Sequence, residues 1–120
     1  MVKINEKLIP NEVYSTNEVK TNKIWIDGKP IYRKVIDNVS ITTGVGNSVA
    51  SGITNMDILV KLEGNLKYTG NNQWITIPSY YSSSIFITAN YDYTQNKIFW
   101  DCGFFTGTGY FVVEYTKTTD

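Results

Sequence analysis

The segment MDILVKLEGNLKY, residues 56–68, has the clearest alternation of apolar and polar side chains in the sequence. Side chains of a strand point alternately to its two faces, so one predicted face carries Met56, Ile58, Val60 and Leu62. The other face is charged, with Leu59 as an apolar exception. This pattern predicts a half-buried β-strand, and Gly64-Asn65 predicts a bulge or a bend within it.

Similar segments recur along the whole chain and are separated by short turns rich in Gly and Asn. No extended window keeps the i, i+3, i+4 apolar pattern of a helix. Further strands are predicted at residues 23–27, 31–41 (with a break near Asp37-Asn38), 74–78, 85–93, 98–105 and 110–117. The Gly/Ser-rich segment 42–54, TTGVGNSVASGIT, is predicted as a loop. Strands at roughly ten-residue spacing predict an all-β fold, a single antiparallel β-sandwich of the jelly-roll kind.

Charge and length limit the classes of partner. The eleven Lys and Arg residues balance eleven Asp and Glu residues, and charged residues make up 18% of the chain. This composition lacks the basic surface of a nucleic-acid-binding protein, so we expect no nucleic-acid partner. Apolar runs are far shorter than the roughly 20 residues of a membrane-spanning helix, so we expect no membrane insertion. A length of 120 residues fits one domain.

The chain contains no histidine, which removes the commonest general base and the commonest metal ligand. Ser-His-Asp and Cys-His catalytic arrangements are therefore excluded. Cys102, the single cysteine, lies in the apolar run IFWDCGFF and is predicted to be a buried thiol that packs in the core. We expect a non-enzymatic protein with no catalytic residues, no bound metal and no cofactor.

Residues 14–36, YSTNEVKTNKIWIDGKPIYRKVI, predict a β-hairpin whose tight turn is Asp27-Gly28-Lys29-Pro30. This segment and the ending GTGYFVVEYTKTTD, residues 107–120, resemble the C-terminal domains of bacteriophage tail-fibre and minor structural proteins. The resemblance implies a homotrimer at the distal end of a tail or head fibre, in contact with other virion proteins, that attaches to the host surface. It brings no set of ligand residues with it.

The resemblance starts at residue 14, so residues 1–13 are predicted to be a connector or N-terminal arm and residues 14–120 a single sandwich domain. A tail fibre would usually be far longer ahead of this motif. We therefore expect either a fragment of a fibre or a small virion protein. Within the hairpin, the predicted packed residues are Ile24, Ile26 and Tyr32. The predicted solvated or intersubunit edge consists of Lys29, Arg33 and Lys34.

Recognition chemistry is predicted downstream of the hairpin, in SYYSSS at residues 79–84. Tyr and Ser together give a large contact area with adaptable hydrogen bonding, and aromatic rings can stack on the apolar side of a sugar. The predicted ligand-binding residues are Trp74, Tyr80, Tyr81, Asn90 and Asp92. The alternatives are an ordinary surface loop with one tyrosine in the core, and a strand end at which Tyr91 and Tyr93 pack against the core.

Asp92 and Asp101 flank the predicted turn at residues 94–97 and are the pair of carboxylates to compare with a glycosidase. Glycosidases hold two carboxyl groups about 5 to 10 Å apart in a cleft. A domain of this size has little room for such a cleft, so we expect these carboxylates to be solvated and not catalytic.

The sequence thus predicts a phage virion protein, namely a tail-fibre or receptor-binding module that attaches to host-surface glycans. The alternatives are a capsid-decorating (head fibre) or baseplate structural protein without a ligand and, more distantly, a carbohydrate-binding module. The chain has nine Tyr, five Phe and three Trp residues. So many aromatic side chains favour an intersubunit interface over a simple rim of exposed tyrosines.

Overall fold

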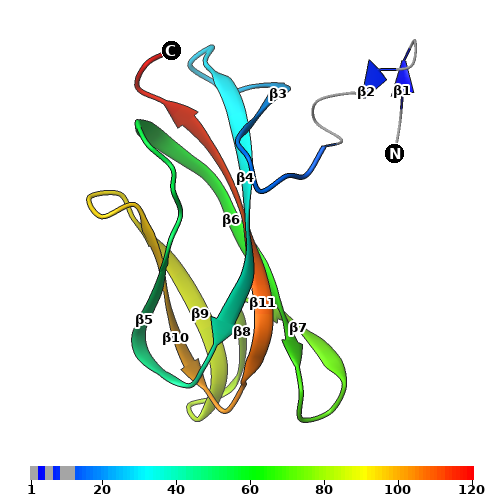
Figure 1. Ribbon diagram of the computed structural model, residues 1–120. Coiled ribbons are helices and arrows are strands. Elements are labelled where there is room, and N and C mark those ends of the chain that lie inside the picture. The colour runs from blue at the N-terminus through cyan, green and yellow to red at the C-terminus, as the bar shows by residue number, and fades with distance from the viewer. Residues whose placement is uncertain (1–2, 5–6, 9–12) are drawn as a thin grey trace.

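The computed structural model describes residues 3–4, 7–8 and 13–120, which form two packed antiparallel sheets and a separate strand pair (Figure 1). The five-stranded sheet contains, in spatial order, β3 (Val19–Ile24), β4 (Pro30–Ile41), β11 (Gly107–Lys117), β6 (Met56–Tyr68) and β7 (Gln73–Ile77). The four-stranded sheet contains β5 (Gly44–Ala50), β10 (Lys97–Gly103), β9 (Ile85–Asp92) and β8 (Ser79–Ser82). The separate pair is β1 (Lys3–Ile4) with β2 (Lys7–Leu8). The predicted all-β antiparallel sandwich is confirmed.

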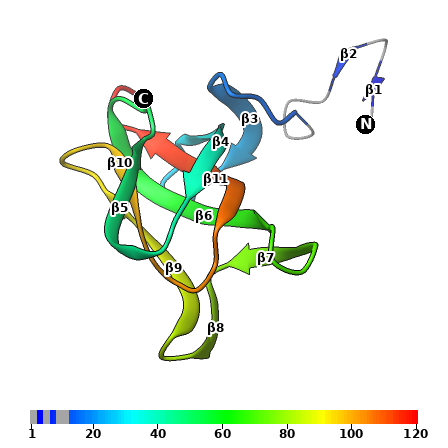
Figure 2. The same cartoon turned by 60° about the horizontal axis from the view of Figure 1, so that its bottom comes forward.

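Each sheet pairs strands that are distant in the sequence. β11 pairs with β4 and β6, and β10 pairs with β5, so the β4–β5 and β10–β11 connections both cross from one sheet to the other. β6–β7 and β8–β9–β10 are sequential hairpins. Figure 2 shows the chain leaving β7 in one sheet and entering β8 in the other. The predicted connector at residues 1–13 falls largely outside the described residues.

The core lies between the sheets and is formed by alternate residues of the central strands. β11 contributes Phe111, Val113 and Tyr115, all fully buried. Inward-facing residues of β6, β9 and β10 pack in the same cluster, among them Leu66, Ile87, Ile98 and Trp100. Cys102 is buried too, its Sγ donates to the carbonyl oxygen of Phe105 at 3.2 Å, and burial raises the pKa of its thiol. The prediction of a core thiol is confirmed.

The predicted bulge in β6 exists at a different residue. Leu59 and Lys61 pair with adjacent residues of β11, so Val60 is the extra residue and the facing of side chains changes there. The apolar exception at Leu59 marks this change. The bulge predicted at Gly64-Asn65 is wrong, because both residues pair in register. A Cβ on Gly64 would lie 2.5 Å from the carbonyl oxygen of Tyr110, so this glycine allows the close approach of β11.

The predicted break in β4 is a bulge within a continuous strand. The pairing of β4 with β11 shifts by one residue at Asp37-Asn38, and Asn38 has a positive φ of 53°. Asn tolerates this left-handed conformation better than most residues. The position of the irregularity was therefore predictable from the two polar turn-forming residues.

Two segments predicted as loops are edge strands. Residues 42–54 contain β5, and SYYSSS contains β8. Both consist largely of small or polar residues and bury little, so their order comes from backbone pairing with β10 and β9. Such pairing leaves no periodic apolar pattern in the sequence.

The predicted hairpin exists, but its turn spans residues 25–28, two residues earlier than predicted, and its packed face also differs. The Trp25 amide donates to the Lys29 carbonyl and the Gly28 amide donates to the Trp25 carbonyl, both at 2.9 Å. Ile24 and Ile26 are 63% and 92% exposed, because β3 ends at Ile24 and the turn projects past the sheet. Tyr32 does pack against the core, where its ring lies 6.1 Å from that of Tyr115.

The outer face of the five-stranded sheet carries a buried ion pair that the sequence did not indicate. Arg33, predicted at a solvated edge, is 2% exposed and donates to Glu114 Oε2 from Nε at 2.9 Å and from Nη2 at 2.7 Å. Arg33 also donates to the carbonyl oxygen of Val13 at 3.2 Å and lies 4.3 Å from the centroid of the Tyr14 ring. The chain ahead of β3 therefore covers this part of the sheet.

Candidate functional site

Three of the five predicted ligand-binding residues lie on one surface, the outer face of the four-stranded sheet. Along β9, the residues from Ile85 to Tyr91 that face the core alternate with residues that face outward. Pairing across the strands then sets the outward residues of β8 and β10 beside those of β9. We call this surface the four-stranded face; its residues are Tyr80, Phe86, Thr88, Asn90, Asp92, Phe99 and Asp101.

Aromatic rings lie toward both ends of the four-stranded face. Tyr80 pairs with Phe86, and their ring centroids lie 6.4 Å apart. Phe99 of β10 pairs with Asn90 of β9. Phe86 and Asn90 are four residues apart on one strand, which is about 13 Å at the usual rise. Thr88 lies between them and is exposed, so hydroxyl and amide groups separate the two aromatic positions.

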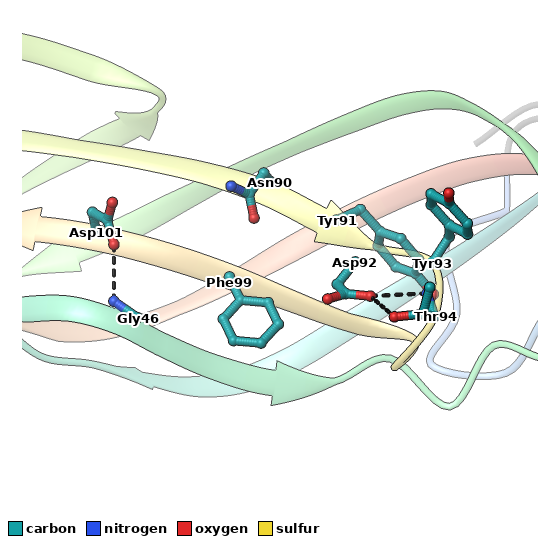
Figure 3. Close-up of a pocket in the computed structure, with 8 residues that line it drawn as sticks. All are labelled: Gly46, Asn90, Tyr91, Asp92, Tyr93, Thr94, Phe99 and Asp101. Carbon is teal, nitrogen blue, oxygen red and sulfur yellow. Dashed lines mark hydrogen bonds between the residues drawn. The ribbon is translucent and has the colours of Figure 1, made fainter.

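The end of this face near the β9–β10 turn forms a shallow hollow of about 650 Å³ (Figure 3). Asn90, Phe99 and Asp92 line it together with Tyr93 and Thr94. Figure 3 shows Asn90 on β9, Phe99 on the neighbouring β10, and Asp92, Tyr93 and Thr94 at the end of β9. A hollow this open suits an extended ligand that lies across the strands more than a small molecule that is enclosed.

The Asp92 carboxylate is occupied by the turn that follows it. Its Oδ1 accepts hydrogen bonds from the Thr94 amide at 2.8 Å, the Thr94 hydroxyl at 2.6 Å and the Gln95 amide at 3.0 Å. Its Oδ2 accepts one from Gln95 Nε2 at 3.0 Å. The Thr94 hydroxyl and the Gln95 amide hold the pKa of the Asp92 carboxyl below its usual value. Asp92 therefore shapes the turn, and only Oδ2 retains spare acceptor capacity for a ligand.

The two carboxylates compared with a glycosidase do not form a catalytic pair. Asp101 pairs with Thr88, four residues before Asp92 on β9. This register separates them by about 13 Å along the strand, beyond the glycosidase range of about 5 to 10 Å. Asp101 Oδ1 accepts a hydrogen bond from the Gly46 amide at 2.9 Å, as Figure 3 shows. Both carboxylates are thus fixed by local hydrogen bonds.

The other two predicted residues lie elsewhere. Tyr81 is 67% exposed, and its ring lies 6.0 Å from that of Phe105 at the end of the sandwich. Trp74 is 58% exposed on the outer face of the five-stranded sheet, where its ring lies 6.4 Å from that of Tyr110. The five residues therefore belong to three surfaces and do not form one site.

Phe86, Thr88 and Phe99 were not among the predicted residues. Phe99 belongs to the run IFWDCGFF, whose mostly apolar character conceals which residues face outward. The strand β10 in fact alternates, with Ile98, Trp100 and Cys102 facing the core. The alternation of β9 was enough to predict that Phe86 faces outward, because its neighbours Ile85 and Ile87 face the core.

The alternative role for the two tyrosines near the end of β9 is half right. Tyr91 packs against the core, and its hydroxyl lies 2.7 Å from the Ser51 hydroxyl. Tyr93 lies beyond the end of β9 and is 77% exposed. The strand ends one residue earlier than the alternation predicts, so Tyr93 is available at the rim of the hollow.

Within the described part of the chain, no three His, Cys, Asp or Glu side chains are grouped as a metal site. The described residues also contain no helix long and apolar enough to cross a membrane. Comparisons with protein-family models, curated proteins and solved structures gave no match to this chain.

Proposed function

We propose that this chain is a non-enzymatic phage virion domain, a tail-fibre or receptor-binding domain that attaches to host-surface glycans through the four-stranded face. The observation that carries the proposal is the arrangement of Tyr80 and Phe86, then Thr88 and Asn90, then Phe99 along adjacent strands. The resemblance of residues 14–36 and 107–120 to phage fibre domains supports the virion context.

This arrangement suits the chemistry of neutral sugars. A pyranose ring has an apolar side, which packs against aromatic rings, and hydroxyl groups around its edge. On this face, Thr88 supplies a hydroxyl and Asn90 an amide. Both can donate hydrogen bonds to sugar hydroxyls and accept hydrogen bonds from them. The aromatic positions are separated by more than the length of one sugar, so the preferred ligand is an oligosaccharide.

Weak binding at one site becomes useful attachment when several sites act together. A shallow site buries little of its ligand, so we expect low affinity for a single domain. In a homotrimer, a second and third site would bind the same surface at a raised effective concentration. The working unit that we propose is therefore a homotrimer on the surface of the phage tail or capsid.

Exposed apolar residues support an oligomer. Ile24 and Ile26 of the β3–β4 hairpin are more than half exposed, and Ile58 and Leu59 of β6 are 38% and 39% exposed. The Lys29–Asp57 ion pair, 2.8 Å from Nζ to Oδ2, links the hairpin to this end of β6. Apolar groups gathered at one end of a small domain are typical of an interface.

A glycan array probed with the full chain tests the proposal. We expect binding to neutral oligosaccharides that falls at least about tenfold in Tyr80→Ala and in Phe99→Ala, since each variant removes one aromatic surface. Tyr81→Ala is the matched control, because Tyr81 is a similarly exposed tyrosine whose ring lies against Phe105, away from this face. Binding that is lost equally in all three variants, or absent from the wild-type chain, would contradict the assignment.

The exposed apolar end of the sandwich also favours a second candidate function, a capsid-decorating or baseplate structural protein. Under this alternative, the residues around Ile26 would pack on another virion protein, and the glycan array would give no signal. Light scattering separates the two: the proposed receptor-binding domain is a trimer alone, whereas a decorating subunit that needs its partner is a monomer. A monomer that nevertheless binds glycans would contradict only the trimer.

A further inference from the structure

The outer face of the five-stranded sheet contains a second and narrower hollow, of about 440 Å³. Its floor is formed by Val35, Asn65 and Val112 of three neighbouring strands, and Tyr14 and Tyr110 also line it. Asp37 and Glu63 complete its lining. We call this hollow the five-stranded groove. It lies on the opposite side of the sandwich from the four-stranded face.

Both tyrosines of the groove are held in place by other side chains. Arg33 lies against one face of the Tyr14 ring, and Arg33 is itself fixed by the buried Glu114. The Tyr110 hydroxyl accepts a hydrogen bond from Asn65 Nδ2 at 2.9 Å, and the Trp74 ring meets the Tyr110 ring at 62°. Aromatic rings that are fixed before binding lose little conformational freedom when a ligand arrives.

The charges that line the groove are all negative. Asp37 and Glu63 are its charged residues, and no Lys or Arg is among the described residues that line it. Glu63 pairs with Lys61 at 3.4 Å, but both side chains are half exposed, so the pair is weak and solvent competes for it. Among the described residues, Asp37 makes no ion pair. An incoming cation therefore meets two carboxylates that no strong internal partner occupies.

We propose that the five-stranded groove binds an organic ammonium group carried on a polar ligand, with the amino sugar of a surface glycan as the expected source. Aromatic faces attract cations, and carboxylates add direct charge pairing at the rim. Asn65 supplies hydrogen bonds for the neutral part of the ligand. The inference goes beyond the proposed function, because it uses different residues and selects for charge and not for a neutral sugar.

The test uses the full chain and a matched pair of ligands in isothermal titration calorimetry. The probes are a tetramer of β-1,4-linked glucosamine, which carries ammonium groups, and the same tetramer with every amine acetylated. We expect the charged tetramer to bind at least about tenfold more tightly, with an affinity that falls as salt is added. Equal affinity for the two tetramers would overturn the proposal.

Variants assign the effect to the groove. The double variant Asp37→Asn, Glu63→Gln keeps shape and removes charge, and we expect it to lose most of the preference for the charged tetramer. Asp27→Asn is the control, since it removes an exposed carboxylate in the hairpin turn. Tyr14→Ala should reduce the preference for the charged tetramer, whereas Tyr80→Ala should leave that preference unchanged. A preference that survives the double variant, or is abolished by Tyr80→Ala, would overturn the proposal.

Choline serves as a third probe that separates the two sources of an ammonium group. Choline binding that the double variant abolishes would assign recognition to the ammonium group itself, free or lipid-linked. Glucosamine binding without choline binding would assign it to the amino sugar. Failure of both probes would overturn the groove proposal while leaving the glycan array on the four-stranded face as an independent result.

Discussion

The two outer faces of the sandwich differ in how much the protein itself covers them. On the five-stranded sheet, the chain around Val13 and Tyr14 lies over Arg33 and Glu114, so polar groups there are buried and paired. On the four-stranded sheet, Thr88 and Asn90 are exposed to solvent. The same alternating strand pattern therefore produces a covered region of polar residues on one sheet and a free surface on the other.

A polar residue at an outward-facing strand position therefore has no fixed role. Glu114 and Thr116 alternate with core residues of β11 just as Thr88 and Asn90 alternate with core residues of β9. Burial and pairing within the protein make Glu114 and Thr116 structural. Exposure to solvent leaves Thr88 and Asn90 available for a ligand.

The largest effect is expected from Glu114→Ala. The substitution leaves the buried Arg33 without its carboxylate on β11, which typically costs about 3 to 5 kcal/mol. Urea denaturation monitored by tryptophan fluorescence measures the change in the free energy of unfolding.

Two further variants sharpen this result. Glu63→Ala removes the half-exposed pair with Lys61 and should cost less than about 1 kcal/mol. Replacing both members of the buried pair by apolar residues, Arg33→Met with Glu114→Leu, should recover most of the loss. If Glu114→Ala cost no more than Glu63→Ala, the contrast between covered and free faces would be wrong.

A matched pair of threonine variants gives the next largest effect. Thr116 is fully buried, and its Oγ1 accepts a hydrogen bond from the Ile58 amide at 3.2 Å, so Thr116→Ala should cost about 1 to 3 kcal/mol. Thr88→Ala on the four-stranded face should change stability by less than about 0.5 kcal/mol. Thermal unfolding of both variants checks the difference, and similar costs would contradict it.

Most of the sandwich was predictable, because its central strands bury one face and so alternate in the sequence. β6, β9 and the β3–β4 hairpin follow from such local signals. β5 and β8 do not, since edge strands of small and polar residues gain their order from backbone pairing with strands far along the chain. The burial of Arg33 likewise depends on a residue 81 positions away, Glu114.

The candidate site was predictable only in part, for the same reason. Tyr80, Asn90 and Asp92 were identified by residue type, but which residues share a face depends on strand register. The register brings Phe99 beside Asn90 and takes Tyr81 and Trp74 to other surfaces. Asp92 illustrates the limit most clearly. The sequence alone does not show whether its carboxylate binds a ligand or, as here, the backbone amides of the following turn.

A smaller, pH-dependent effect is expected at Glu18, which fastens the chain ahead of β3 to the sheet. Burial alone would raise the pKa of Glu18, but hydrogen bonds from the Tyr115 hydroxyl and from Lys117 Nζ, the latter at 2.9 Å, outweigh it and lower the pKa below 4.5. A lowered folded-state pKa means that the contribution to stability is present above about pH 4.5 and is lost as the pH falls through the folded-state value.

Glu18→Gln should therefore flatten the pH dependence of stability below about pH 4.5. Denaturation midpoints of the variant and the wild-type chain, compared between about pH 6 and about pH 3, measure the effect. Glu63→Gln is the control, because Glu63 makes only a half-exposed and weak pair with Lys61. Parallel curves for the wild-type chain and Glu18→Gln would show that this carboxylate does not fasten the segment.

The smallest effect is expected from Asp92→Ala and is local to the four-stranded face. The substitution removes the acceptor of the Thr94 and Gln95 amides, so these two amides should exchange hydrogen faster while the amides of β11 keep their protection. Asp92→Asn retains an acceptor oxygen and should change exchange less. If Asp92→Ala weakened glycan binding with Thr94 exchange unchanged, Asp92 would contact the ligand directly. Faster exchange together with weaker binding would instead mean that Asp92 acts by shaping the turn that borders the hollow, which is the outcome that its four hydrogen bonds favour.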